Sequence, residues 1–171
     1  TFSNGQEPIY MRGGLDWEIT DNTIYGDGDA SHIGIATRNG YGIIDGNTLI
    51  DADGGILVDQ ITANQVVNTT NNDISQSAGR SAPSAVGIWA EDCASSIINT
   101  GGNTISVMEN ALVTDGCDIN DSGSTFTAVG GAGGTVYTVQ ILSRSYAPQN
   151  LTINEAVSYT HLTLPTKWTV W

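Results

Sequence analysis

Acidic residues recur at one position of a short repeated segment, and a pair of carboxyl groups is what glycoside hydrolysis requires. Four strand-like pentapeptides read GIATR, GILVD, GIWAE and ALVTD, and their fifth residues are Arg38, Asp59, Glu91 and Asp115. Hydrolases hold two carboxyl groups about 5–5.5 Å apart for retention and about 6.5–9.5 Å apart for inversion. Strands stacked about 4.8 Å apart would supply such separations. Asp59, Glu91 and Asp115 are therefore catalytic candidates, although a solvated acidic ladder has the same geometry and is the simpler interpretation.

The third residues of the same pentapeptides include a tryptophan, Trp89. Because side chains alternate along a strand, the second and fourth residues would fill a core and the third and fifth would point outward. Trp89 would then offer a flat apolar face to a sugar ring, beside carboxylates that accept bonds from its hydroxyl groups. Arg38 and Trp89 are the ligand-binding candidates. The alternatives are that Trp89 packs under the loop at residues 77–83 and that Arg38 only pairs with Asp59.

Two acidic turns have the composition of a calcium site. The segments DGD and DADGG carry alternating carboxylates at Asp27, Asp29, Asp51 and Asp53. Hard cations such as Ca²⁺ prefer oxygen ligands of this kind, but neither segment has a complete EF-hand spacing. These four residues are the metal candidates, and Ca²⁺ is the one cofactor that the sequence suggests.

Other catalytic chemistry has little support in the sequence. His32 is the only histidine outside the C-terminal tail, and a single histidine on a loop is more typical of a solvated side chain than of a catalyst. No Gly-x-Ser-x-Gly motif, phosphate-binding loop or Cys/His zinc pattern occurs. Neither a nucleophilic serine nor a nucleotide or zinc site is therefore indicated.

The charge balance limits the partners. The chain has 18 Asp and Glu against 5 Lys and Arg, a formal net charge of −13. Such a chain repels the phosphates of nucleic acids and anionic membrane surfaces, so nucleic acid is not an expected partner. No apolar run approaches the roughly 18–20 residues that cross a bilayer, so no membrane insertion is expected within this segment. The first residue is not Met, which suggests a mature or truncated chain.

The C-terminal segment 157–171 is set apart from the rest of the chain. It begins with VSYTHLTLPT, a string that resembles the translation of a sequencing adapter, a known contaminant at the ends of metagenomic reading frames. We therefore expect a non-native tail with no part in the fold. The alternative is a genuine last strand around the residues LTLP.

An asparagine recurs in a longer repeat. The motifs DNTI, GNTL, NNDI and GNTI contain Asn22, Asn47, Asn72 and Asn103, and a loop-forming insertion at residues 77–83 explains the longer last interval. Two or three short strands in about 21–25 residues fit one turn of a parallel β-helix, whose coils lie about 4.8 Å apart. Asn suits the corner because it tolerates the left-handed backbone conformation and its amide can bond to the amides above and below.

These repeats predict an all-β fold, a right-handed parallel β-helix (solenoid) of about four to five coils. The coils are expected to cover residues 1–122. Residues 123–156 contain a Gly-rich turn between segments of alternating apolar and polar residues, which predicts an antiparallel hairpin or an irregular last coil. A β-sandwich is the alternative architecture, but it would not require a recurring Asn.

The two cysteines occupy equivalent positions of the repeat. Cys93 lies five residues after Ile88, and Cys117 lies five residues after Leu112. The repeat therefore stacks them in neighbouring coils with Cα atoms about 5 Å apart, within disulfide range. An oxidising compartment favours the bond, and stacked free thiols are the alternative.

The repeat between Asp16 and Asn120 resembles the right-handed parallel β-helix repeats of extracellular polysaccharide lyases, polygalacturonase-type hydrolases and bacterial surface proteins. The resemblance implies an extracellular or cell-surface location and a polysaccharide or cell-surface glycan as partner. It implies no single activity, because unrelated functions share this scaffold. The hydrolase pattern of an adjacent Asp pair, Gly-His-Gly and Arg-Ile-Lys is missing. We therefore expect a fragment with a structural, adhesive or glycan-contacting role, and the scaffold of a lyase or hydrolase is the alternative.

Overall fold

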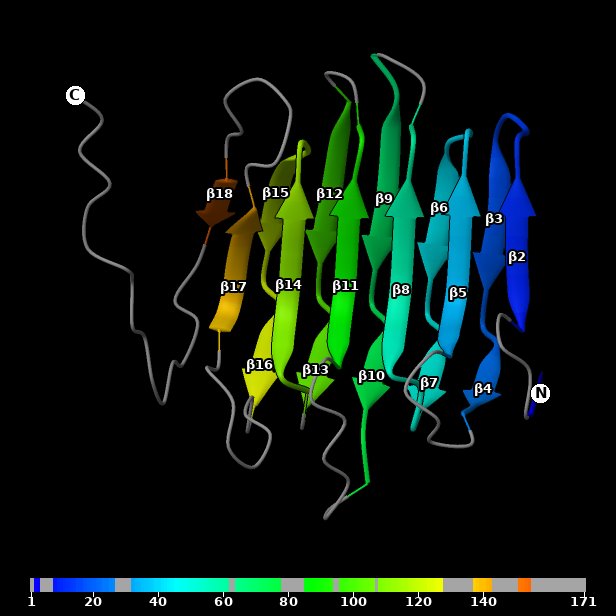
Figure 1. The fold of residues 1–171 in the computed structure, drawn as a ribbon, viewed down its shortest axis with the longest axis vertical. Helices are drawn as coiled ribbons and strands as arrows, with labels where there is room; N and C mark the ends of the chain where they lie inside the picture. The colour runs from blue at the N-terminus through cyan, green and yellow to red at the C-terminus, as the bar shows by residue number, and fades with distance from the viewer. Residues whose placement is uncertain are drawn as a thin grey trace.

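The computed structural model describes residues 2–3, 8–26, 32–61, 64–77, 85–93, 96–106, 108–127, 137–142 and 151–154. These residues form β-strands joined by tight turns, and no helix is found among them (Figure 1). Three parallel sheets build a β-solenoid of about four turns. The predicted all-β parallel β-helix is confirmed, and the β-sandwich alternative is wrong because the sheets of a sandwich are antiparallel.

The chain passes through sheets B, C and A in turn, adding one strand to each. Sheet A contains β1 (Phe2–Ser3), β4 (Thr23–Tyr25), β7 (Thr48–Ile50), β10 (Asp73–Ser75), β13 (Thr104–Ser106) and β16 (Thr125–Thr127). Sheet B contains β2 (Ile9–Arg12), β5 (Ile33–Arg38), β8 (Gly54–Asp59), β11 (Val86–Glu91), β14 (Asn110–Asp115) and β17 (Tyr137–Leu142). Sheet C contains β3 (Trp17–Thr20), β6 (Gly42–Asp45), β9 (Val66–Thr70), β12 (Ile97–Gly101), β15 (Asp118–Ser122) and β18 (Leu151–Asn154).

Inward columns of aliphatic residues form the core. The column of sheet B consists of Ile35, Ile56, Ile88 and Leu112, which are paired in register and at most 1% exposed. Sheet A adds Ile24, Leu49, Ile74 and Ile105, and sheet C adds Val67, Ile98 and Ile119. Ile44 lies in the next inward column of sheet C, in register with Thr69. Burial of one such side chain contributes about 1.5–3 kcal/mol, and β-branched residues pack well on a pleated surface. The alignment of the four pentapeptides in the sequence is therefore the strand register of sheet B.

Glycine opens three of the pentapeptides because the core residues of sheet A approach closely where the chain enters sheet B. A Cβ atom on Gly55 would lie 2.6 Å from Cγ2 of Ile74, and one on Gly87 would lie 2.6 Å from Cγ2 of Ile105. Both separations are far shorter than van der Waals contact, so a larger residue would push the two sheets apart.

The four repeated asparagines stack at the corner between sheets C and A. Asn47 donates from its backbone N and from Nδ2 to Oδ1 of Asn72, both at 3.0 Å, and Asn72 donates in the same way to Asn103. Nδ2 of Asn72 also donates to the Ile44 carbonyl at 3.1 Å. Asn22 donates to Asn47, and Ser124 continues the ladder as an acceptor for Asn103. We call this stack the corner ladder, and its hydrogen bonds hold successive coils together.

One detail of the corner prediction is wrong. The left-handed residue is not the stacked Asn but the residue before it: Asp21, Gly46, Asn71 and Gly102 have φ of 56°, 66°, 53° and 62°. The chain needs a positive φ to turn, and Gly, Asn and Asp tolerate it best. The following Asn is then free to point inward and bond along the stack.

The C-terminal strands continue the solenoid. β17 pairs in parallel with β14, and β18 pairs in parallel with β15, so the antiparallel hairpin is wrong and these strands follow the alternative of a last coil. The predicted non-native tail at residues 157–171 lies outside the described residues.

Candidate functional site

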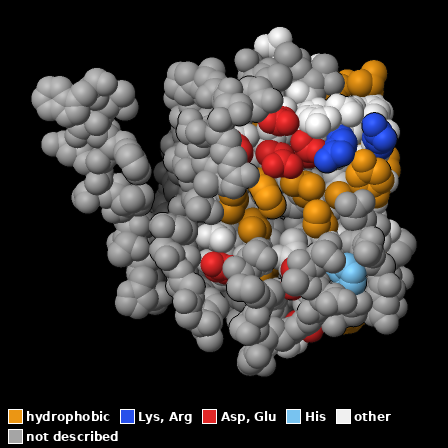
Figure 2. Space-filling model, viewed as in Figure 1, with side chains coloured by type: hydrophobic (Ala, Val, Ile, Leu, Met, Phe, Trp, Pro, Cys, Tyr) orange, Lys and Arg blue, Asp and Glu red, His pale blue; other side chains and the backbone are white. Residues whose placement is uncertain are grey.

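The outer face of sheet B presents two columns of side chains from successive coils. The strand register aligns Tyr10, Ala36, Leu57, Trp89 and Val113 in an apolar column. It aligns Arg12, Arg38, Asp59, Glu91 and Asp115 in a charged column beside it. Figure 2 shows acidic and basic side chains next to one another, with a band of hydrophobic side chains along them. We call these two columns the sheet B face.

The charged column is less solvated than the sequence suggested. Asp59 is 2% exposed and Asp115 is 8% exposed, so the interpretation as a freely solvated acidic ladder is wrong for these two residues. Nε of Arg38 donates a hydrogen bond to Oδ2 of Asp59, and the two form an ion pair. The Arg38 side chain remains 38% exposed, which leaves it able to meet a ligand. The predicted ion pair is present, and it neutralises the most buried acid of the column.

Burial and like charges disfavour ionisation in the middle of the charged column. Burial raises the pKa of Glu91, and the carboxylates of Asp59, Asp92 and Asp115 raise it further. Burial also raises the pKa of Asp59, although its hydrogen bond and ion pair with Arg38 act in the opposite direction. Glu91 has no ion-pair partner among the described residues, and the pKa of its carboxyl group is raised.

The apolar column is only partly open to solvent. Trp89 is half-buried, and its Nε1 atom is buried without a hydrogen-bond partner in the described part of the chain. Ala36 and Val113 are buried. Tyr10 is 43% exposed and is the most accessible aromatic side chain of the face. The loop at residues 77–83, which was predicted as a possible cover for Trp89, lies outside the described residues except for Ser77.

Sequence reasoning missed Tyr10 and Arg12. Both belong to β2, which pairs with β5 so that Tyr10 lies beside Ala36 and Arg12 beside Arg38. The signal was the match between IYMR at residues 9–12 and IATR at residues 35–38. The coil at the N-terminal end therefore extends both columns and adds a second cation.

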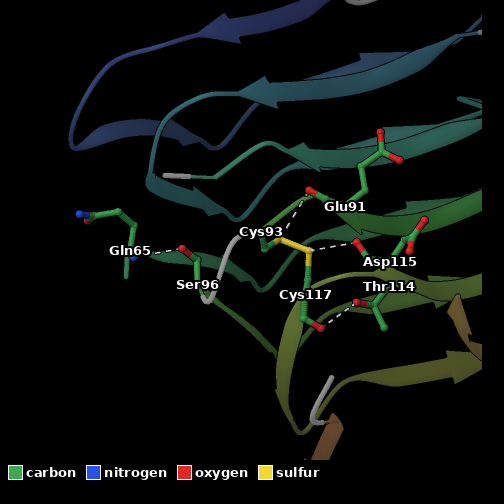
Figure 3. Close-up of a disulfide and its surroundings, with 7 residues drawn as sticks. All are labelled: Gln65, Glu91, Cys93, Ser96, Thr114, Asp115 and Cys117. Atoms are coloured by element: carbon green, nitrogen blue, oxygen red, sulfur yellow. Dashed lines mark hydrogen bonds between the residues drawn. A yellow bond between two sulfur atoms is a disulfide. The ribbon is translucent and has the colours of Figure 1, made fainter. Parts of the chain in front are cut away.

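A disulfide joins two coils of the sheet B face at the corner where the chain leaves β11 and β14. Cys93 and Cys117 are bonded, with Cα atoms 4.8 Å apart, and both are at most 1% exposed (Figure 3). Each follows an acidic residue of the charged column by two positions, Glu91 and Asp115 respectively. The covalent bond therefore ties together the backbones of the two neighbouring coils that carry these carboxylates.

The metal candidates lie elsewhere and have other partners. Asp27 and Asp29 lie outside the described residues. Asp51 accepts hydrogen bonds from the backbone N and Oγ of Ser77 at 2.6 and 2.8 Å, and Asp53 accepts one from Gln76 at 3.3 Å. The described residues bring together no group of three or more His, Cys, Asp or Glu that could hold a metal ion.

His32 is 8% exposed, so the interpretation of this residue as a solvated loop histidine is wrong. It lies directly before β5, where the Gly54 backbone N donates to its carbonyl oxygen at 3.0 Å. His32 therefore lies at the corner between sheets A and B and not in the charged column.

No protein-family model, curated protein or solved structure matches this chain. The fold therefore defines its class, a parallel β-solenoid. Within the described part of the chain, no helix has the length and hydrophobicity to cross a membrane.

Proposed function

We propose that this chain is part of a secreted or cell-surface protein and that its sheet B face contacts an extended glycan without transforming it. The observation that carries the proposal is the pairing of two columns, one apolar and one charged, at the constant spacing of the coils. A sugar ring has an apolar face and a rim of hydroxyl groups, so it needs both kinds of surface next to each other.

The rigidity of the solenoid supports this proposal. The corner ladder and the disulfide fix the coils, so little conformational entropy is lost when the face binds a ligand. Successive coils about 4.8 Å apart offer repeated positions, which suits a polymer of similar repeating units. Tyr10 supplies the exposed ring, and Arg38 and Glu91 supply donor and acceptor atoms along it.

The disulfide supports the proposed location. Such bonds persist in oxidising compartments, which include the cell surface and the extracellular space. Cys93 and Cys117 are both deeply buried in the hydrophobic core, as expected of a structural bond.

Affinity electrophoresis against neutral and acidic polysaccharides tests the proposal. We expect at least one polysaccharide to retard the wild-type chain, and Tyr10→Ala to weaken that binding about tenfold, as loss of one aromatic contact does. Tyr25→Ala is the matched control, because Tyr25 is also 43% exposed but lies on the outer face of sheet A. Equal losses in both variants, or no retardation by any polysaccharide in the panel, would contradict the proposal.

The alternative is a scaffold that hydrolyses or cleaves the glycan, and the raised pKa of Glu91 favours it. A carboxyl group with a raised pKa beside a second carboxyl group is the arrangement that a general acid and its partner require. Asp59 or Asp115 would be the partner, on either side of Glu91 in the register. An assay for released reducing ends tests this alternative. If the wild type releases them, and Glu91→Gln binds the polysaccharide but releases none, the face is catalytic and the binding-only role is wrong.

A further inference from the structure

The outer face of sheet C has an uncharged centre. The register aligns Val66 with Ile97, and these two side chains are 41% and 42% exposed. Beside them lies an outward column of Asn68, Asn99 and Asn120, and then one of Thr70, Gly101 and Ser122. Neither β9 nor β12 has a charged residue. We call these three columns the sheet C face.

The asparagines of this face form a second, exposed ladder. Nδ2 of Asn99 donates to Oδ1 of Asn68 at 2.9 Å, and Nδ2 of Asn120 donates to Oδ1 of Asn99 at 3.4 Å. An amide has two N–H donors and two acceptor lone pairs, so Asn99 keeps one of each after these bonds. A surface of such groups is complementary to a copy of itself.

The acidic residues of sheet C lie around this centre. Asp118 of β15 is in register with Ile97 and therefore lies directly beside the apolar pair, and Glu18 lies in β3 at the end of the sheet. Asp45 in β6 accepts hydrogen bonds from Oγ1 of Thr70 and from Nδ2 of Asn71. A chain with a net charge of −13 repels a second copy, and a contact between uncharged surfaces adds no close like-charge pair to that repulsion.

We propose that the sheet C face is the interface of a homodimer, in which the face of one chain packs on the same face of a second copy around a two-fold axis. Isologous interfaces require a self-complementary patch, and flat sheets carrying Asn ladders and β-branched residues pack tightly on one another. The outward columns of β9, β12 and β15 offer no aromatic side chain for a sugar ring and no cation for a phosphate. A second copy therefore fits this face better than a glycan or a nucleic acid.

Sedimentation of the full chain between about 1 µM and 1 mM, the range of weak interfaces, tests this dimer. We expect a concentration-dependent shift from one chain to two, strengthened by salt because screening weakens the repulsion between two acidic chains. The double variant Val66→Lys, Ile97→Lys should weaken dimerisation at least tenfold. Because two lysines reduce the net negative charge, greater overall repulsion cannot explain that loss.

The matched control is Tyr25→Lys with Thr125→Lys, which makes the same change of charge on exposed residues of sheet A and should dimerise like the wild type. Thermal unfolding shows whether each variant is folded, and Ile97→Lys alone replaces the double variant if it is not. A wild-type chain that stays monomeric throughout, or a folded Val66→Lys, Ile97→Lys variant that dimerises unchanged, would overturn the proposal. So would equal losses in the two double variants.

Discussion

The outer faces of sheets B and C rest on the same repeating backbone and carry opposite chemistry. The sheet B face has an ion pair, Arg38 with Asp59, and two further acids, while the centre of the sheet C face is uncharged and its polar groups are amides and hydroxyls. Behind both faces lies the same kind of buried aliphatic column. In a solenoid the inward residues set the register, so the outward residues can differ from face to face without changing the fold.

The two asparagine ladders make the same contrast with one residue type. In the corner ladder Asn47, Asn72 and Asn103 are at most 1% exposed and bond to backbone groups as well as to one another. On the sheet C face Asn99 is half-buried, and its side chain is hydrogen-bonded to the neighbouring amides of Asn68 and Asn120. Buried amides therefore stabilise the stack, whereas exposed amides are available to a partner.

The largest effect is expected in the corner ladder. Asn72→Ala removes the acceptor of two Asn47 hydrogen bonds and the donor to the Ile44 carbonyl, all in a buried site. Each buried group left without a partner costs about 1–3 kcal/mol, so we expect a loss of about 4 kcal/mol in the free energy of unfolding. Urea denaturation measures it. A loss below about 1 kcal/mol would remove the distinction between the two ladders.

Removal of the disulfide is expected to have the next largest effect. Cys93→Ala with Cys117→Ala opens a covalent loop with a sequence separation of 24 residues, which corresponds to about 3 kcal/mol of stability. The bond lies at the corner that joins sheets B and C, so both faces should become less ordered together. Hydrogen exchange of β11, β12, β14 and β15 would show this, and faster exchange in only one sheet would contradict it.

The register of the fold could be predicted from the sequence because it depends on residues with one acceptable environment. The glycine and isoleucine that open GILVD and GIWAE fix the phase of each strand, and the Asn after each left-handed corner fixes the turn. The same residue types recur in each coil, so the four copies of the repeat support one another although each copy alone is a weak indication.

The solvation of the sheet B face could not be predicted in the same way. Asp59 and Asp115 point outward as their positions require, and yet they are buried, because coverage depends on neighbouring coils and on Arg38. The parallel pairing of β17 was also hidden, since alternation along a strand does not distinguish parallel from antiparallel partners. The sheet C face was missed because Asn68 and Asn99 lie in the strands before the corner, outside the four-residue motifs that contain the corner asparagines.

The substitution Glu91→Gln in the charged column is expected to have a smaller effect on the free energy of unfolding, and the size of that effect depends on pH. The pKa of Glu91 is raised in the folded chain above its ordinary value near 4.3, so the folded state binds more protons in the window between the two values. Stability therefore falls as the pH rises through this window. Glu91→Gln should make that fall shallower. At pH 7 the free energy of unfolding of this variant should equal that of the wild type or exceed it by less than about 1 kcal/mol.

Urea unfolding of Glu91→Gln and of the wild type at several pH values from about 4 to 7 measures this difference. Glu18→Gln is the control, because Glu18 is exposed at the edge of sheet C, away from the charged column. A steeper decline in Glu91→Gln, or an equal change in Glu18→Gln, would show that the charged column is not the cause.

The smallest effect on stability is expected for Asn99→Ala, which is the counterpart of Asn72→Ala on the exposed ladder. The variant loses the hydrogen bonds to Asn68 and from Asn120, but water can replace both, so the free energy of unfolding should change by less than about 0.5 kcal/mol. If the sheet C face is the dimer interface, the same variant should nevertheless dimerise several-fold more weakly, because Asn99 lies in the middle of the self-complementary amide column. Urea unfolding in dilute solution and sedimentation at high concentration separate the two quantities. A large loss of stability would show that the exposed ladder supports the fold as the corner ladder does, and the contrast between the two would then be wrong.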